Sequence, residues 1–330
     1  MNDKDFQDAV KKLKYLIDNA STITILSHIN PDPDALGTAL GIYALLRQDK
    51  NKKIEVVNAS KELPRFLDFL PYFNHIKHKM DYNESLVISC DCGNADRLGF
   101  DVGRREILNI DHHYSNTHYG SVNIVIPEYA SSSQVAYEIF KTYHTIIPEA
   151  ATCFYAALLS DTRYFTTSSV NHKVFDMASE LIKAGACAAD ISSHFTQRRP
   201  LASLRILQRA LDSLTLYQNA TIACMTITQD EVYASGATMP DMDGVVDYAR
   251  SLATVEIAIC AIQTEDSIRI SLRSKNVDVS KIALAFGGGG HKLAAGFTFK
   301  QSGLQQAVNA ILEKIKILGL TDEKSSQKDK

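Results

Sequence analysis

The first part of the chain alternates between short apolar runs and stretches with helical periodicity. The runs "TITILS", "KIEVVN", "SLVISC" and "EILNI" have the length and composition of buried β-strands. After the first run, residues 34–48 place Leu36, Leu40, Tyr43 and Leu46 on one face of a helix. Strands that alternate with helices predict an α/β fold, with an N-terminal doubly wound, mainly parallel sheet and helices on both of its faces.

The pattern changes further along the chain. Helical periodicity dominates residues 131–214, whereas residues 218–299 contain runs such as "TVEIAICAIQ" and "SIRISLRS", which are typical of strands with one exposed face. We therefore predict a second, smaller α/β domain with a mixed sheet. The predicted boundaries are 1–194 for the first domain, 195–217 for a connecting helix or linker, 218–318 for the second domain and 319–330 for a disordered tail.

Charge and cysteine content narrow the classes of protein that the chain could represent. The formal net charge is -3, from 35 Lys+Arg and 38 Asp+Glu, so there is no overall positive field to hold long duplex nucleic acid. The six cysteines are scattered and contain no C-x-x-C pair, which favours a reduced, cytoplasmic protein. No apolar run is long enough to span a bilayer, and we expect no membrane partner.

Acidic and imidazole side chains stand where predicted strands end. His28 ends the first strand, Asp91 follows the third, Asp111 ends the fourth, and Asp32 and Asp34 follow His28 in "HINPDPDALG". In doubly wound sheets, ligands bind beyond the carboxyl ends of the strands, so these residues are expected to converge. Carboxylates mixed with imidazole suit Mn²⁺ or a similar divalent ion, and the number of donors is sufficient for two ions that share a carboxylate.

Each of these residues also has a simpler interpretation when it is taken alone. An Asp after a strand is usually a turn residue or a helix N-cap, Asp34 could cap the following helix, and His113 could be a partly buried polar side chain. However, only "KIEVVN" among the four predicted strands ends without Asp or His. Capping alone would seldom produce that pattern, which therefore favours a metal site.

Four motifs, "SHINPDPDALG", "VISCDCG", "NIDHHYSN" and "LLSDTRYF", together resemble those of the DHH phosphoesterase superfamily. Further along, "SLRSK" and "FGGGGHKLAAGF" resemble the DHH-associated C-terminal domain of its nanoRNase-type and cyclic di-AMP phosphodiesterase-type members. The resemblance implies a metal-binding catalytic domain followed by a substrate-binding domain. It also implies two Mn²⁺ ions as cofactors, for which Mg²⁺ or Co²⁺ could substitute.

The resemblance further implies a role for each residue of the motifs. The implied ligands of one ion are His28, Asp32 and Asp91, and those of the other are Asp34, Asp91, His112 and Asp161. Asp91 would then bridge the two ions. As catalytic residues, His113 would face the substrate phosphate and Asp111 would orient the histidines. Only the resemblance points to Asp161, because that residue follows a predicted helix instead of a strand.

The second domain contains two features suited to phosphate. Arg269 and Arg273 alternate with apolar residues and so share one face of a strand, although a solvated outer face would have the same pattern. The run "GGGGH" could form an anion-binding nest, although a glycine run is more often a flexible turn, and "KLAAG" after it is compatible with a short helix. With the resemblance, the candidate substrate-binding residues are Arg269, Arg273, Gly288, Gly289, Gly290 and His291.

The resemblance implies a Mn²⁺-dependent phosphodiesterase that hydrolyses short 5′-phosphorylated oligoribonucleotides, or linear dinucleotides such as pApA and pGpG, to mononucleotides. The implied mechanism is in-line attack by a hydroxide that bridges two metals. Three alternatives stay open: a cyclic di-AMP phosphodiesterase, a 3′-phosphoadenosine 5′-phosphate phosphatase and, without catalysis, a nucleotide-binding sensor. Relatives of this kind are often dimers, so a homodimer stays open as well.

Overall fold

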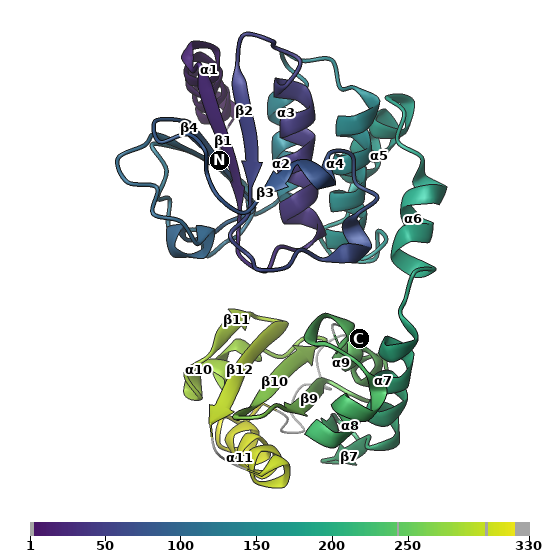
Figure 1. Ribbon diagram of the computed structural model, residues 1–330. Helices are drawn as coiled ribbons and strands as arrows, with labels where there is room; N and C mark the ends of the chain where they lie inside the picture. Colours follow the sequence, from purple (N-terminus) through teal and green to yellow (C-terminus); the bar gives the residue numbers. More distant parts are fainter. Residues whose placement is uncertain (1–2, 243, 301–302, 321–330) are drawn as a thin grey trace, which may run out of the picture. The chain divides into compact units, whose positions relative to one another are not determined.

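The computed structural model describes residues 3–242, 244–300 and 303–320, and the chain divides into two compact units, residues 1–198 and 199–330 (Figure 1). The first unit contains a parallel sheet and the second a mixed sheet, so the predicted fold class is confirmed. Residues 321–330 of the predicted tail lie outside the described residues. Within the described ranges, no helix combines the length and the apolar character needed to cross a membrane.

In the described part of the first unit, six parallel strands lie in the order β3-β2-β1-β4-β5-β6. The strands are β1 (Thr22–Ser27), β2 (Lys53–Val57), β3 (Ile76–Lys77), β4 (Leu86–Cys90), β5 (Ile107–Asp111) and β6 (Val122–Val125). The helices are α1 (Asp3–Asn19), α2 (Pro33–Leu46), α3 (Ser132–Phe140), α4 (Pro148–Asp161), α5 (His172–Lys183) and α6 (Ala188–Thr196), with short 3-10 helices η1 (Arg65–Leu67), η2 (Phe73–His75) and η3 (Ala95–Leu98).

Successive residues of the central strands enter different cores, as the alternation of a β-strand requires. Ile25 of β1 and Ile88 of β4 belong to the large core that also contains residues of α2, α3, α4 and α5. Leu26 and Val87, one position away, belong to a smaller cluster that includes Leu98 of η3. The sheet is therefore covered on both faces, and its strand ends remain available for polar side chains.

Helices α2 and α4 pack at very short range because α2 carries two glycines. A Cβ atom added to Gly37 would lie 2.6 Å from the carbonyl oxygen of Cys153 and 2.8 Å from the Cβ of Ala157. A Cβ atom added to Gly41 would lie 2.3 Å from the ring of Phe154. A side chain on α2 at position 37 or 41 would not fit against α4, so the two glycines determine how closely the helices approach.

Gly37→Ala is expected to lower the free energy of unfolding by about 1–3 kcal/mol, because overpacking outweighs the gain in helix propensity. The same substitution should weaken binding of Mn²⁺, because it moves the first turn of α2 away from the last turn of α4. These turns contain Asp34 and Asp161, two of the implied metal ligands. Urea denaturation and isothermal titration with Mn²⁺ would measure the two effects. An unchanged denaturation midpoint would contradict the close packing.

In the described part of the second unit, the strand order is β11-β12-β10-β9-β8-β7; β8 and β9 are parallel and the other pairs antiparallel. The strands are β7 (Thr215–Tyr217), β8 (Ile222–Ile227), β9 (Ile257–Gln263), β10 (Ser267–Ser274), β11 (Gly289–His291) and β12 (Ala294–Lys300). The helices are α7 (Leu201–Asp212), α8 (Gln229–Ser235), α9 (Val245–Arg250), α10 (Ser280–Ala285) and α11 (Leu304–Ile317), with the 3-10 helix η4 (Met239–Met242).

Two cores cover the two faces of this sheet. Ile259 of β9 enters a core shared with α10 and α11, whereas Cys260 enters a core shared with α7 and α9. Helix α7 lies in the segment predicted as a connector, and its residues Ile206 and Ala210 are fully buried in the second of these cores.

The segment "KLAAG" does not form the short helix that the sequence suggested; β12 begins within it, at Ala294, so that prediction was wrong. The glycine run explains the difference, because it lets the chain fold back closely onto β12. A Cβ atom on Gly288 would lie 2.3 Å from the carbonyl oxygen of Gly296 and 2.3 Å from the Cβ of Phe297. In the resulting hairpin Gly289 pairs with Gly296, and strand hydrogen bonds replace those of a helix.

Candidate metal centre

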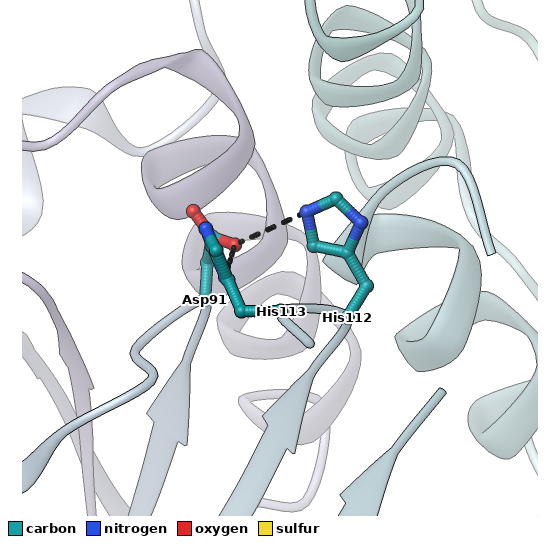
Figure 2. A group of neighbouring side chains, drawn as sticks. All are labelled: Asp91, His112 and His113. Atoms are coloured by element: carbon teal, nitrogen blue, oxygen red, sulfur yellow. Dashed lines mark ion pairs between the residues drawn. The ribbon is translucent and has the colours of Figure 1, made fainter. Parts of the chain in front are cut away.

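Acidic and imidazole side chains gather at the carboxyl ends of β1, β4 and β5, which are neighbours in the sheet. His28 follows β1, Asp91 follows β4, and Asp111 is the last residue of β5, directly before His112 and His113. The imidazoles of His112 and His113 both approach Asp91 (Figure 2). The convergence expected from strand order is therefore present in the structure.

The first group of possible metal ligands consists of His28, Asp32 and Asp91. Nε2 of His28 lies 3.6 Å from Oδ2 of Asp91 and 3.9 Å from Oδ2 of Asp32. Two donors that share an ion at about 2.1 Å are roughly 3.0–3.5 Å apart, so only small shifts would be needed. Asp32 caps α2 through its other oxygen, which accepts a hydrogen bond from the N–H of Ala35 (2.9 Å), while Pro33 occupies the first helical position, where proline is favoured.

The second group consists of Asp34, His112 and Asp161, the last residue of α4. Nε2 of His112 lies 3.3 Å from Oδ2 of Asp161 and 3.9 Å from Oδ2 of Asp34. It also lies 3.8 Å from Oδ1 of Asp91. Asp91 thus presents Oδ2 to the first group and Oδ1 to the second, and this is the geometry that a bridging carboxylate requires.

The N-terminus of α3 holds two of these carboxylates, which the sequence did not reveal. The backbone N–H groups of Ser132 and Ser133 donate to the two oxygens of Asp34, at 2.7 and 3.1 Å. The hydroxyl of Ser132 donates to Oδ1 of Asp91 (2.8 Å). The simpler interpretation of Asp34 as the N-cap of α2 is therefore wrong, because the capping residue is Asp32. The run of serines predicts the start of a helix but not what the helix points toward.

Backbone carbonyls fix the orientation of two histidines. Nδ1 of His28 lies 2.8 Å from the carbonyl oxygen of Ile29, and Nδ1 of His112 lies 3.2 Å from that of Tyr129. A carbonyl oxygen only accepts hydrogen bonds, so these contacts favour a proton on Nδ1 and, when the ring is neutral, a lone pair on Nε2. In both residues Nε2 is the nitrogen that faces the carboxylates, as metal-binding histidines usually have it.

His113 is held differently, by a carboxylate. Its Nδ1 lies 2.7 Å from Oδ1 of Asp111, which is completely buried. The second oxygen of Asp111 accepts a hydrogen bond from Nδ2 of Asn116 (2.5 Å). The geometry suits the implied role of Asp111 in orienting His113, and that role stays a prediction.

The electrostatics of the cluster favour a bound cation. Burial and the nearby Asp91 raise the pKa of Asp34 well above its usual value, and burial raises the pKa of Asp161 to about 7 although His112 opposes the shift. Burial would also raise the pKa of Asp91, but His28, His113 and His112 hold it below its usual value. Buried carboxylates that repel one another are stabilised by a divalent ion, and oxygen with imidazole is a suitable donor set. The side chains present therefore fit a divalent metal.

Binding of Mn²⁺ is expected to release protons and to strengthen as the pH rises. Burial lowers the pKa of His28, but the nearby carboxylates of Asp32 and Asp91 outweigh it and raise the pKa to about 10, so the metal-free imidazole is protonated at pH 7.5. It must lose that proton to bind an ion, so the apparent affinity should increase up to tenfold per pH unit for each proton released. Below about pH 7, Asp161 would add a further proton. Titration calorimetry in two buffers of different ionisation enthalpy would measure the release, and a buffer-independent enthalpy would contradict it.

The candidate residues of the second unit share one face of its sheet. In the strand register Arg273 lies opposite Ala294, which in turn lies opposite His291, and Arg269 lies opposite Thr298. Directly opposed residues project from the same face of a sheet. The structure thus places both arginines and His291 on one face, beside the small side chain of Ala294 and the glycines of β11.

The two arginines differ in their surroundings. Nε of Arg273 lies 3.9 Å from Oδ2 of Asp247, on α9, and its Nη1 donates to the carbonyl oxygen of Leu272 (3.0 Å). The side chain of Arg273 is therefore held against α9, whereas Arg269 is exposed. We expect Arg269 to adapt more readily to a ligand.

Comparisons with known proteins agree with this architecture. Residues 22–158 match the DHH family, N-terminal domain, and residues 207–317 match the DHHA1 domain. The bifunctional oligoribonuclease and PAP phosphatase NrnA of Thermus thermophilus is 28% identical over 299 residues, which are 89% of each chain. The cyclic-di-AMP phosphodiesterase PdeA of Listeria monocytogenes is 25% identical over 92% of this chain and 48% of its own length.

A solved structure has the same fold over nearly the whole chain. The crystal structure of an exopolyphosphatase-related protein from Bacteroides fragilis superimposes with a TM-score of 0.88 and 26% identity, and covers 94% of this chain and 97% of its own. The two domain matches occur in the order in which the motifs stand in the sequence. The chain is therefore an enzyme of the DHH family of phosphoesterases, with a DHHA1 domain after its DHH domain.

Proposed function

We propose that this enzyme hydrolyses short 5′-phosphorylated oligoribonucleotides, and linear dinucleotides such as pApA and pGpG, to mononucleotides, with two Mn²⁺ ions as cofactors. The observation that carries the proposal is the position of Asp91, whose two carboxylate oxygens face two separate groups of donors. The name of the Thermus thermophilus relative, an oligoribonuclease, supports the choice of substrate.

Two sets of side chains would hold the ions. His28 and Asp32 would bind one, Asp34, His112 and Asp161 the other, and Asp91 both. The chemistry supplied by bound divalent ions is Lewis-acid activation of water and neutralisation of charge on the phosphoryl oxygens.

The protein's own side chains would orient the substrate and complete the site. Asp111 accepts the hydrogen bond from Nδ1 of His113, which supports Nε2 of that ring as the nitrogen that would act on the substrate phosphate. Burial lowers the pKa of His113, but Asp111 and Asp91 raise it to about 9 in the metal-free site, and these carboxylates would favour the protonated ring. A cationic imidazole next to the phosphate would stabilise the charge that develops in the transition state.

We propose that the arginine and glycine face of the DHHA1 domain binds the part of the nucleotide that is not cleaved. A guanidinium such as that of Arg269 can meet a phosphate bidentately. The strand β11, whose backbone N–H groups could bind an anion, pairs with residues 294–296 of β12, which lie opposite residues 271–273 of β10. The name of the Thermus thermophilus relative, an oligoribonuclease, favours short oligonucleotides over long ones.

Two other substrates have specific support. The relative from Thermus thermophilus is also named a PAP phosphatase, which favours removal of the 3′-phosphate of 3′-phosphoadenosine 5′-phosphate as a second activity. The Listeria monocytogenes relative is named a cyclic-di-AMP phosphodiesterase, which favours cyclic di-AMP as an alternative substrate. Both reactions would use the same metal centre.

A product-resolved assay would test the proposal. Purified full-length protein with Mn²⁺ would be incubated with pApA, pGpG, cyclic di-AMP, 3′-phosphoadenosine 5′-phosphate and RNAs of increasing length, and the products separated by chromatography. We expect AMP or GMP from the linear dinucleotides and slower turnover of longer RNAs. If every substrate stayed intact, the alternative of a nucleotide-binding sensor would replace the proposed activity.

A further inference from the structure

Arg97 is a cation beside the metal centre that neither the motifs nor the proposed mechanism uses. It lies on η3, and its Nη2 is 3.2 Å from Nδ1 of His28. The residue is exposed, and among the residues that the structure describes no carboxylate oxygen lies within 4.0 Å of its guanidinium. A positive charge therefore stands next to the first group of carboxylates without being paired to any of them.

The backbone that carries Arg97 is firmly held. Its carbonyl oxygen accepts a hydrogen bond from the N–H of Ile29 (2.7 Å), and the next residue, Leu98, is completely buried. Gly99 ends η3 with a φ of +71°, and a Cβ atom there would lie 2.7 Å from Cγ2 of Ile29. The absence of a side chain at Gly99 thus lets η3 pack directly against the loop that follows β1, and this packing places the guanidinium over His28.

Once an ion is bound to His28, that histidine can no longer accept a hydrogen bond from Arg97. Nδ1 of His28 lies close to both a donor, Arg97, and an acceptor, the carbonyl oxygen of Ile29 (2.8 Å). A histidine that binds a metal through Nε2 carries its proton on Nδ1, which can then donate to Ile29 but cannot accept from Arg97. With metal present, Nη2 of Arg97 loses this acceptor, and an oxygen anion at the metal centre could take its place in competition with water.

We propose that Arg97 binds a non-bridging oxygen of the phosphate group held at the metal centre. Guanidinium groups match phosphate oxygens in charge and in geometry, and an exposed, unpaired arginine on a fixed backbone is well suited to this contact. The inference rests on the proposed function only in taking the ligand to be a phosphate ester. It makes Arg97 a substrate-binding residue of the DHH domain, separate from the arginines of the DHHA1 domain.

Binding of AMP to the Mn²⁺-loaded full chain would test this role without depending on turnover. We expect Arg97→Gln to weaken AMP binding about 10- to 100-fold, the loss typical of a hydrogen bond to a charged group, and Arg97→Lys to have a smaller effect. Affinity for Mn²⁺, measured separately by titration calorimetry, should change less than about twofold, because Ile29 and not Arg97 orients His28.

Arg104→Gln is a matched control, because Arg104 is exposed in the same domain and lies outside the cluster. It removes the same charge and should leave AMP binding unchanged. If Arg97→Gln weakened Mn²⁺ binding tenfold, Arg97 would be a positioning residue for His28 and the proposal would be overturned. Unchanged binding of both AMP and Mn²⁺ would overturn it as well. If AMP binding changed as expected while no oligonucleotide was cleaved, this inference would stand and the proposed function would fail.

Discussion

Asp91→Asn is expected to abolish hydrolysis, with turnover lowered at least about 1,000-fold, and to weaken the binding of Mn²⁺. The carboxylate of Asp91 is the only one whose two oxygens face His28 and His112, respectively, among the contacts between described residues. An asparagine keeps one oxygen, loses the negative charge and replaces the second oxygen with a group that cannot bind a metal. Both groups of donors are weakened together, which corresponds to several kcal/mol of transition-state stabilisation.

Titration calorimetry with Mn²⁺ and the assay on pApA would measure the two effects of Asp91→Asn. Asp96→Asn is a suitable control, because Asp96 is an exposed carboxylate on η3, only five positions away, and the substitution changes the net charge equally. Turnover close to that of the unmodified enzyme in Asp91→Asn would refute the bridging role.

His113→Gln is expected to lower turnover about 100- to 10,000-fold while leaving Mn²⁺ binding nearly unchanged. The reason is geometric, because Nδ1 of His113 lies 2.7 Å from Oδ1 of Asp111 and only 3.4 Å from Oδ1 of Asp91, so its contact with Asp111 competes with any contact to an ion. His112→Gln provides the comparison, because Nε2 of His112 faces three carboxylates and its loss should weaken metal binding as well as turnover.

Comparison of the two variants distinguishes the metal-binding role of His112 from the substrate-binding role of His113. Single-turnover assays at saturating Mn²⁺ would remove any contribution from weak metal binding. If His113→Gln lost as much Mn²⁺ affinity as His112→Gln, then His113 would be a metal ligand, and the proposed contact with the substrate phosphate would have to be abandoned.

The fold class and the convergence of the strand ends could be predicted from the sequence because both follow from periodic patterns. Short apolar runs gave β1, β2, β4 and β5 with bounds close to those observed, and parallel strands bring His28, Asp91 and Asp111 to one edge. Asp161 could not be found in this way. It ends a helix, and its approach to His112 depends on how α4 packs against α2, which no local pattern encodes.

The side chains that support the site were missed for a related reason. Ser132 and Arg97 reach the cluster from α3 and η3, and each depends on contacts between segments distant in the sequence. Runs of serines and single arginines in loops are common on protein surfaces that bind nothing, so neither stands out before the chain is folded. The error at "KLAAG" has a different origin: small residues allow both helix and strand, and the close approach to the preceding glycines decided in favour of the strand.

The close contact of α2 with α4 also bears on any attempt to transfer this site to another protein. Asp34 and Asp161 come from these two helices, and the space between them is determined at Gly37 and Gly41, which offer no donor to a metal. A designer who copied every acidic and imidazole side chain onto a helix pair of ordinary spacing would separate the two carboxylates. Transfer of the site would therefore also require glycine at the positions of Gly37 and Gly41, which contribute by lacking a side chain.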